Sequence, residues 1–96
     1  MRVGVEIKES PIHGLGVFVT KPVKKGENIG VAIDAFKRVT YVGSKVNHSW
    51  NPSCVLVKNE NSYHIVTAKD LSEYSEVTLD YRDTPEFIAK PEESWK

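Results

Sequence analysis

The chain has 96 residues, of which 40% are hydrophobic and 27% are charged, and this composition is typical of a globular protein. A length of this order supports one small domain spanning residues 1–96, with no room for a second core. The apolar runs are far shorter than the roughly 20 residues of a membrane-spanning helix. The single cysteine excludes an intrachain disulfide, and no Cys/His group has the spacing of a metal site.

The charges cancel overall but are unevenly distributed. Residues 1–48 contain eight Lys/Arg against four Asp/Glu, whereas residues 49–96 contain five against nine. The basic half suits a polyanion and the acidic half suits a cationic partner, although an uneven surface without a charged partner is equally compatible with these counts. The N-terminal sequence lacks the apolar stretch of a signal peptide, which favours an intracellular protein, cytoplasmic or nuclear.

The local patterns predict a series of short β-strands. Alternating or β-branched apolar residues indicate strands over residues 3–7, 17–20, 29–33, 54–58, 63–67 and 77–79. Turn residues separate them at 10–14, 24–27 and 59–62, and the last of these reads as a hairpin connection. Helix is expected only as one turn near residues 45–48 and around 85–89. Many short strands with close turns favour a mostly β fold with little helix.

Two segments of the chain resemble each other weakly. Residues 23–29 and residues 71–77 each combine an apolar anchor, a tight turn and the start of a strand. The turn glycine of the first segment, Gly26, is replaced by Tyr74 in the second. Beyond the last strand, residues 84–96 contain Phe87 and Trp95, and we expect this tail to pack back onto a core formed by about residues 3–83.

Three segments carry residues suited to binding or chemistry. Gly14 and Gly16 flank Leu15 and let the backbone approach a ligand closely, although a glycine-rich turn is the simpler interpretation. Asn47 and His48 precede a proline-stopped turn and offer several polar groups, which a purely structural role would also explain. Tyr81 follows the last strand, where its hydroxyl could project into a cleft or simply face water. No nucleophile–His relay typical of hydrolases is evident.

Taken together and in order, these segments resemble the SET domain, the family of protein-lysine methyltransferases that use S-adenosylmethionine. The family's G-x-G-V-F segment corresponds to residues 14–18, and its apolar-x-x-G-E turn corresponds to residues 23–29. The N-H-S-x-x-P-x-C segment corresponds to residues 47–54, and the closing E-x-T-x-D-Y segment to residues 76–81. The match is closest to small stand-alone SET proteins of viruses and microbes.

The resemblance implies a compact β-clip fold with a knot-like C-terminal crossing, and direct in-line methyl transfer to a lysine ε-amine in a narrow channel. It assigns the catalytic role to Tyr81. The other implied roles concern the cofactor, S-adenosylmethionine. Gly14, Leu15 and Gly16 would contact its methionine part, and Asn47 and His48 would contact its amine and adenine. Phe87 or Trp95 would cover the adenine. Phe87 and Trp95 could equally seal the edge of the core. No metal is implied, and the substrate would be a protein or peptide lysine, such as that of a histone-like basic protein.

One departure from the family pattern affects the substrate site. Only 20 residues separate Gly26 from Asn47, which leaves no room for the helical insert that forms one wall of the family's peptide groove. The site would be shallower unless a second subunit of a homodimer completes it. Two alternatives follow: a SET-like module that binds cofactor or a protein partner without turnover, and a small β domain that binds nucleic acid. The nucleic-acid-binding domain would use basic residues beside two aromatic ones, namely Lys21, Lys24, Lys25, Lys37 and Arg38, with Phe36 and Tyr41. The neutral net charge disfavours this alternative.

Overall fold

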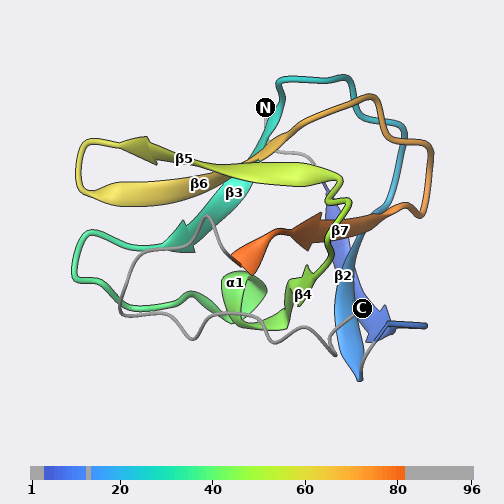
Figure 1. Cartoon of the computed structure of the whole chain (residues 1–96), viewed down its shortest axis with the longest axis horizontal. Helices are drawn as coiled ribbons and strands as arrows, with labels where there is room; N and C mark the ends of the chain where they lie inside the picture. The colour runs from blue at the N-terminus through green and yellow to red at the C-terminus, as the bar shows by residue number, and fades with distance from the viewer. Residues whose placement is uncertain (1–3, 13, 82–96) are drawn as a thin grey trace.

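A computed structural model of the chain describes residues 4–12 and 14–81 (Figure 1). Within these residues the chain forms seven β-strands and one short helix. The elements are, in chain order, β1 (Val5–Glu9), β2 (Leu15–Val19), β3 (Asn28–Ile33), α1 (Tyr41–Lys45), β4 (Asn47–His48), β5 (Cys54–Asn59), β6 (Ser62–Thr67) and β7 (Glu76–Leu79). The structure is therefore mostly β, as the alternating sequence pattern predicts.

The strands form two small sheets. The first has the order β1-β2-β7-β4, in which the β1–β2 and β2–β7 pairs are antiparallel and β4 runs parallel to β7. The second has the order β3-β6-β5 and is antiparallel throughout. Figure 1 shows the β5–β6 hairpin extending to the left, with β7, β2 and β4 to the right and α1 below β7. The two-residue strand β4 thus joins the first sheet at the edge nearest to α1.

The core lies between the two sheets. The first sheet contributes the completely buried side chains of Val17, Val19 and Val77, and the second sheet contributes those of Cys54 and Ile65. Val46, the residue before β4, is also completely buried. Burying one aliphatic side chain of this size stabilises the fold by about 1.5–3 kcal/mol. Hydrophobic packing therefore holds the first sheet, including its edge strand β4, against the second sheet.

The two similar segments of the sequence adopt the same local structure. Val23 and Leu71 pair antiparallel through two backbone hydrogen bonds of 2.8 and 2.7 Å. Three residues after each of them the chain enters the left-handed region, with φ of 86° at Gly26 and 65° at Tyr74. The resemblance between residues 23–29 and 71–77 therefore reflects two equivalent turns placed side by side.

Most of the predicted strands are confirmed, but the helix predicted at residues 45–48 is wrong. The helical turn lies earlier, because the Thr40 hydroxyl caps it by accepting a hydrogen bond of 3.0 Å from the backbone N–H of Gly43. Asn47 and His48 are extended because they pair with Thr78 and Leu79 of β7. The helix expected at residues 85–89, the packing of residues 84–96 and the knot-like crossing lie outside the described residues.

Candidate functional site

Strand β4 brings the Asn47-His48 segment against the strand that leads to Tyr81. Asn47 lies opposite Thr78, and His48 lies opposite Leu79. The pairing continues beyond β4, where the backbone N–H of Ser49 donates to the carbonyl of Leu79 over 3.0 Å. Because β7 also pairs with β2, the three segments singled out in the sequence lie in adjacent strands of one sheet.

A carboxylate links the Asn47 side chain to the glycine-rich segment. The Nδ2 atom of Asn47 donates to Oε2 of Glu76 over 2.9 Å and to the carbonyl of Leu15 over 3.3 Å. The hydroxyl of Ser10 lies 2.9 and 2.8 Å from the two carboxylate oxygens of Glu76 and donates to them. Four strands or turns therefore meet at Glu76, and Asn47 is held with its amide nitrogen facing these acceptors.

The glycine at position 16 is required by this arrangement. A β-carbon there would lie 2.4 Å from Oε2 of Glu76 and 3.1 Å from Nδ2 of Asn47. Gly14 differs, because nothing lies within 4 Å of a β-carbon there, and its φ of 45° serves the turn closed by a hydrogen bond of 2.8 Å from Ser10 N to its carbonyl. Gly16 thus makes room for the Glu76 side chain of the protein itself, whereas the sequence pattern predicts an approach to a ligand, and Gly14 serves the turn.

His48, Trp50 and Tyr81 form an aromatic cluster at the ends of β4 and β7. The backbone N–H of Tyr81 donates to Nδ1 of His48 over 3.1 Å, which fixes the imidazole ring with Nδ1 as an acceptor. The ring centroid of His48 lies 4.3 Å from that of Trp50 in an edge-to-face arrangement and 5.3 Å from that of Tyr81. His48 is buried and therefore positions both neighbours.

The Tyr81 hydroxyl points back toward β4. It donates a hydrogen bond to the backbone carbonyl of Val46, the residue before the Asn47-His48 pair. Burial raises the pKa of the Tyr81 phenol above its ordinary value. The hydroxyl is therefore protonated at neutral pH, and its oxygen retains lone pairs to accept hydrogen bonds.

The Tyr81 side chain forms one wall of a pocket of about 170 Å³. The other lining residues come from β3, the segment around α1, β5 and β7, and most of them are apolar: Ala32, Ile33, Val39, Gly43, Ser44, Leu56 and Leu79. The pocket is about half open to solvent, and a group entering it would exchange water for hydrocarbon on the side of these walls. An amine there would be pushed toward its neutral form.

The structure brings together most of the residues that the sequence suggested, and it adds others. Leu15 contributes its carbonyl to Asn47, while its side chain is exposed. Phe87 and Trp95 lie outside the described residues. The sequence suggests no role for Ser10 or Trp50, and Glu76 appears in it only as part of the closing E-x-T-x-D-Y segment. The contact between Ser10 and Glu76 joins residues 66 positions apart in the chain. For Trp50 a signal existed, because an aromatic residue two positions after His48 is near enough in the chain to contact its ring.

Two further properties of the described residues bear on the site. Within residues 4–12 and 14–81, no three His, Cys, Asp or Glu side chains cluster as metal ligands would. In the same part of the chain, the only helix is the five-residue α1, which is too short to cross a membrane.

Comparison with known proteins identifies the fold. No protein-family model and no curated protein sequence matches this chain. Among solved structures, the chain is similar to a protein from Plasmodium falciparum described as a "putative histone methyltransferase". The TM-score is 0.69 with 18% sequence identity, and the match covers 82% of this chain and 93% of that one. The protein therefore has a mostly β, SET-like fold of small sheets, shared with a structure described as a methyltransferase.

Proposed function

We propose that this protein is an S-adenosylmethionine-dependent protein-lysine N-methyltransferase. The fold supports a protein of the methyltransferase kind. The observation that carries the finer proposal is the hydrogen bond from the Tyr81 backbone to His48, because it joins the end of β7 to the segment that contacts the glycines. A phenol, an amide and a closely approached glycine thus lie in adjacent strands.

The residues around Gly16 fit the amino-acid part of S-adenosylmethionine. The Glu76 carboxylate and the Leu15 carbonyl are hydrogen-bond acceptors, as an ammonium group requires, and both already accept from the Asn47 amide beside Gly16. Gly14, Leu15 and Gly16 would then bind the methionine part. Asn47 and His48 would bind the amine and the adenine, and Phe87 or Trp95 would cover the adenine.

The bound cofactor would supply a methyl group on a sulfonium, which is the electrophile of the reaction. Tyr81 would orient the attacking amine, because its proton is engaged by the Val46 carbonyl and its oxygen is left to accept a hydrogen bond from that amine. A lysine amine has an unperturbed pKa of about 10.4 and must lose a proton before it can attack. The apolar walls of the Tyr81 pocket would lower that pKa by desolvation.

The test is transfer of a labelled methyl group from S-adenosylmethionine to a panel of proteins and lysine peptides. The Tyr81→Phe variant is compared with Tyr63→Phe, which removes a hydroxyl from another half-buried tyrosine on β6. We expect Tyr81→Phe to lose on the order of 10²-fold in turnover, the scale of one positioned polar group, and Tyr63→Phe to be unchanged. Equal labelling by both variants would remove Tyr81 from its role, and a wild-type protein inactive on every substrate would contradict the proposal.

A second candidate function is a SET-like module that binds the cofactor or a protein partner without turnover. It is favoured by the short connection between β3 and α1, which consists of residues 34–40 and leads into a helix of five residues. A substrate groove would have a low wall there unless a second copy of the chain completes it. Tight binding of S-adenosylmethionine in calorimetry without methyl transfer, for monomer and dimer alike, would favour this candidate.

The basic residues of the nucleic-acid alternative lie in two groups along the chain. Lys21, Lys24 and Lys25 precede β3, whereas Lys37 and Arg38 follow it. The six residues of β3 lie between the two groups, which separates them by about 20 Å at the rise of an extended strand. In the second group, the guanidinium of Arg38 lies 5.1 Å from the ring centroid of Phe36.

A further inference from the structure

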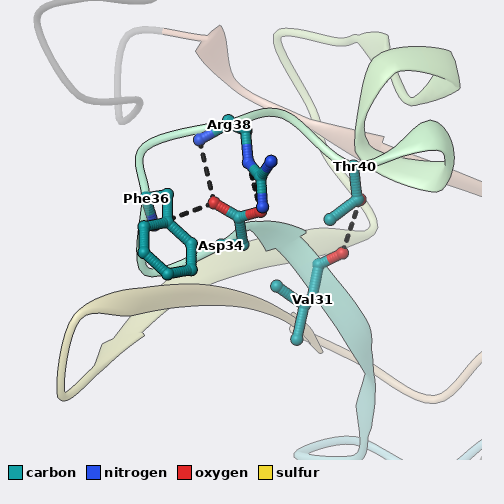
Figure 2. A network of polar contacts seen from close by, with 5 residues as sticks. All are labelled: Val31, Asp34, Phe36, Arg38 and Thr40. Carbon is teal, nitrogen blue, oxygen red and sulfur yellow. Dashed lines mark hydrogen bonds and ion pairs between the residues drawn. The ribbon is translucent and has the colours of Figure 1, made fainter.

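The loop between β3 and α1 is held in one conformation by the carboxylate of Asp34. Its Oδ1 atom accepts the backbone N–H groups of Phe36 and Arg38 over 2.9 and 3.0 Å, and its Oδ2 atom accepts Nε of Arg38 over 3.1 Å (Figure 2). These bonds lower the pKa of Asp34, with the backbone of Arg38 as the main cause. The carboxylate is thus ionised and engaged within the loop at neutral pH.

The backbone of this loop closes as a tight hairpin. Asp34 N donates to the carbonyl of Arg38 over 2.9 Å, and Lys37 N donates to the carbonyl of Asp34 over 3.0 Å. Lys37 has a φ of 63°, in the left-handed region where glycine is favoured. A cationic side chain therefore occupies the tip of the loop in a backbone conformation that costs strain.

The loop and the following helix expose aromatic rings beside cations. Phe36 and Tyr41 are 78% and 66% exposed. The guanidinium of Arg38 lies 5.1 Å from the ring centroid of Phe36, and Nζ of Lys45 lies 5.6 Å from that of Tyr41. Residues 34–45 contain three cationic residues and one acidic residue, Asp34, which pairs with Arg38. The surface is therefore positively charged and partly apolar.

This surface adjoins the pocket that contains Tyr81. Val39 of the loop and Gly43 and Ser44 of α1 line that pocket. The Thr40 hydroxyl donates to the carbonyl of Val31 over 2.7 Å, which ties the end of the loop to β3 (Figure 2). Residues that flank a side chain inserted in the pocket would consequently pass over the exposed part of the loop.

We propose that the surface formed by Phe36, Lys37, Arg38, Tyr41 and Lys45 binds acidic residues that flank the substrate lysine. This inference rests on the proposed lysine methylation. Carboxylates complement the cations, and a guanidinium stacked on a ring is well suited to pair with them. Apolar neighbours would pack on the exposed rings. The preferred substrate is therefore a lysine in an acidic, apolar sequence, rather than one in the basic, histone-like sequence that the family resemblance implies.

The experiment compares short fluorescent peptides with one central lysine whose neighbours are Leu with Glu, Leu with Gln, or Leu with Arg. Binding is measured by anisotropy at low and high salt, and methyl transfer to the same peptides is measured separately. Lys37→Gln is compared with Lys25→Gln, which removes the same charge at the other end of β3. Phe36→Ala tests the ring, and Lys37→Gly removes the cation while relieving the strained φ, which guards against misfolding.

We expect the Glu peptide to bind most tightly and to weaken with salt. Lys37→Gln and Lys37→Gly should each weaken its binding about threefold, the scale of one exposed ion pair, while Lys25→Gln leaves it unchanged. Phe36→Ala should weaken the Glu and Gln peptides alike, by about fivefold. Equal or tighter binding of the Arg peptide, or equal losses in Lys37→Gln and Lys25→Gln, would overturn the inference.

The two proposals fail in different ways. Charge-selective peptide binding without any methyl transfer would overturn the methyltransferase and leave the docking surface. Methyl transfer that is indifferent to the neighbours would overturn the docking surface and leave the methyltransferase. Lys37-dependent binding of a single-stranded oligonucleotide, with no binding of the Glu peptide, would assign the surface to nucleic acid and overturn the inference.

Discussion

The carboxylate of Glu76 lies over Gly16, at 2.4 Å from the position that a β-carbon of residue 16 would take. This contact makes Gly16 part of the same unit as Ser10 and Asn47, which also hydrogen-bond to Glu76. The glycine that the sequence pattern associates with ligand binding is thus also required by the protein's own packing. The packing requirement can be tested by substitution.

Gly16→Ala should displace the Glu76 carboxylate and break its hydrogen bonds. We expect a loss of about 2–3 kcal/mol in the free energy of unfolding, because the bonds involve a charged acceptor. Gly14→Ala is the matched control, since it encounters only backbone strain of about 1–2 kcal/mol at φ 45° and no neighbouring atom. Urea denaturation checks both values. A Gly16→Ala variant that is no less stable than Gly14→Ala would contradict the importance of the Glu76 contact.

The Thr78 hydroxyl should be essential for joining β7 to the residue before β5. Its Oγ1 accepts the buried backbone N–H of Ser53 over 2.9 Å, and Thr78 N donates to Oγ of Ser53 over 3.0 Å. Thr78→Val keeps the shape but leaves the Ser53 N–H without its acceptor, which costs about 1–3 kcal/mol.

Thr78→Ser is the control, because it keeps the hydroxyl and loses one buried methyl group, worth about 0.8 kcal/mol. Thermal and urea unfolding measure both variants. A valine variant as stable as wild type would show that another group satisfies the Ser53 N–H.

Tyr74 should respond to substitution in an unusual order. Its φ of 65° disfavours any side chain, and its ring lies 4.9 Å from Nζ of Lys8. Tyr74→Ala loses the cation–ring contact and keeps the strain, whereas Tyr74→Gly loses the contact and relieves the strain. The glycine variant should therefore be more stable than the alanine variant by about 1 kcal/mol.

The equivalent turn supplies the control for Tyr74. Gly26→Ala introduces the same strain at φ 86° and should cost about 1 kcal/mol, as measured by urea denaturation. If alanine proves better than glycine at position 74, the two turns are not equivalent.

The stability of the protein should fall as the pH rises past 9. Burial raises the pKa of the Cys54 thiol above its ordinary value of 9.0. Between these two pKa values the unfolded chain has lost the proton that the folded chain keeps, so alkaline pH favours unfolding. Tyr81, whose pKa is also raised by burial, adds the same trend above 10.0.

Cys54→Ala should flatten the decrease in unfolding free energy just above pH 9.0, whereas Ile65→Val should lower the whole curve by about 1 kcal/mol without changing its slope. Urea denaturation on both sides of pH 9.0 distinguishes them. An unchanged slope in Cys54→Ala would show that the thiol does not titrate on unfolding.

The strands could be predicted from the sequence because their signal is local. Residues 63–67, for example, are rich in aromatic and β-branched side chains, and the structure confirms a strand there, β6, with Ile65 and Thr67 buried. The order of the strands within the sheets is not encoded by such a pattern. It follows from pairings between distant segments, such as β2 with β7.

The errors and omissions have the same origin. Strand β4 consists of two residues, which is too short for a recognisable period, and residues 45–48 therefore read as a helical turn. The role of Glu76 depends on Ser10 and Asn47, which are 66 and 29 positions away. Asn47, His48 and Tyr81 entered the prediction through a family resemblance, and only the tertiary structure shows which groups orient them.

The parallel pairing of β4 with β7 also determines when the site can form. His48 meets the backbone of Tyr81 across 33 positions of chain, and β4 is too short to persist without that partner. During synthesis, the chain up to residue 75 would leave the ribosome with none of the bonds to Glu76 in place. The candidate site should therefore form late and abruptly, after the last strand has emerged.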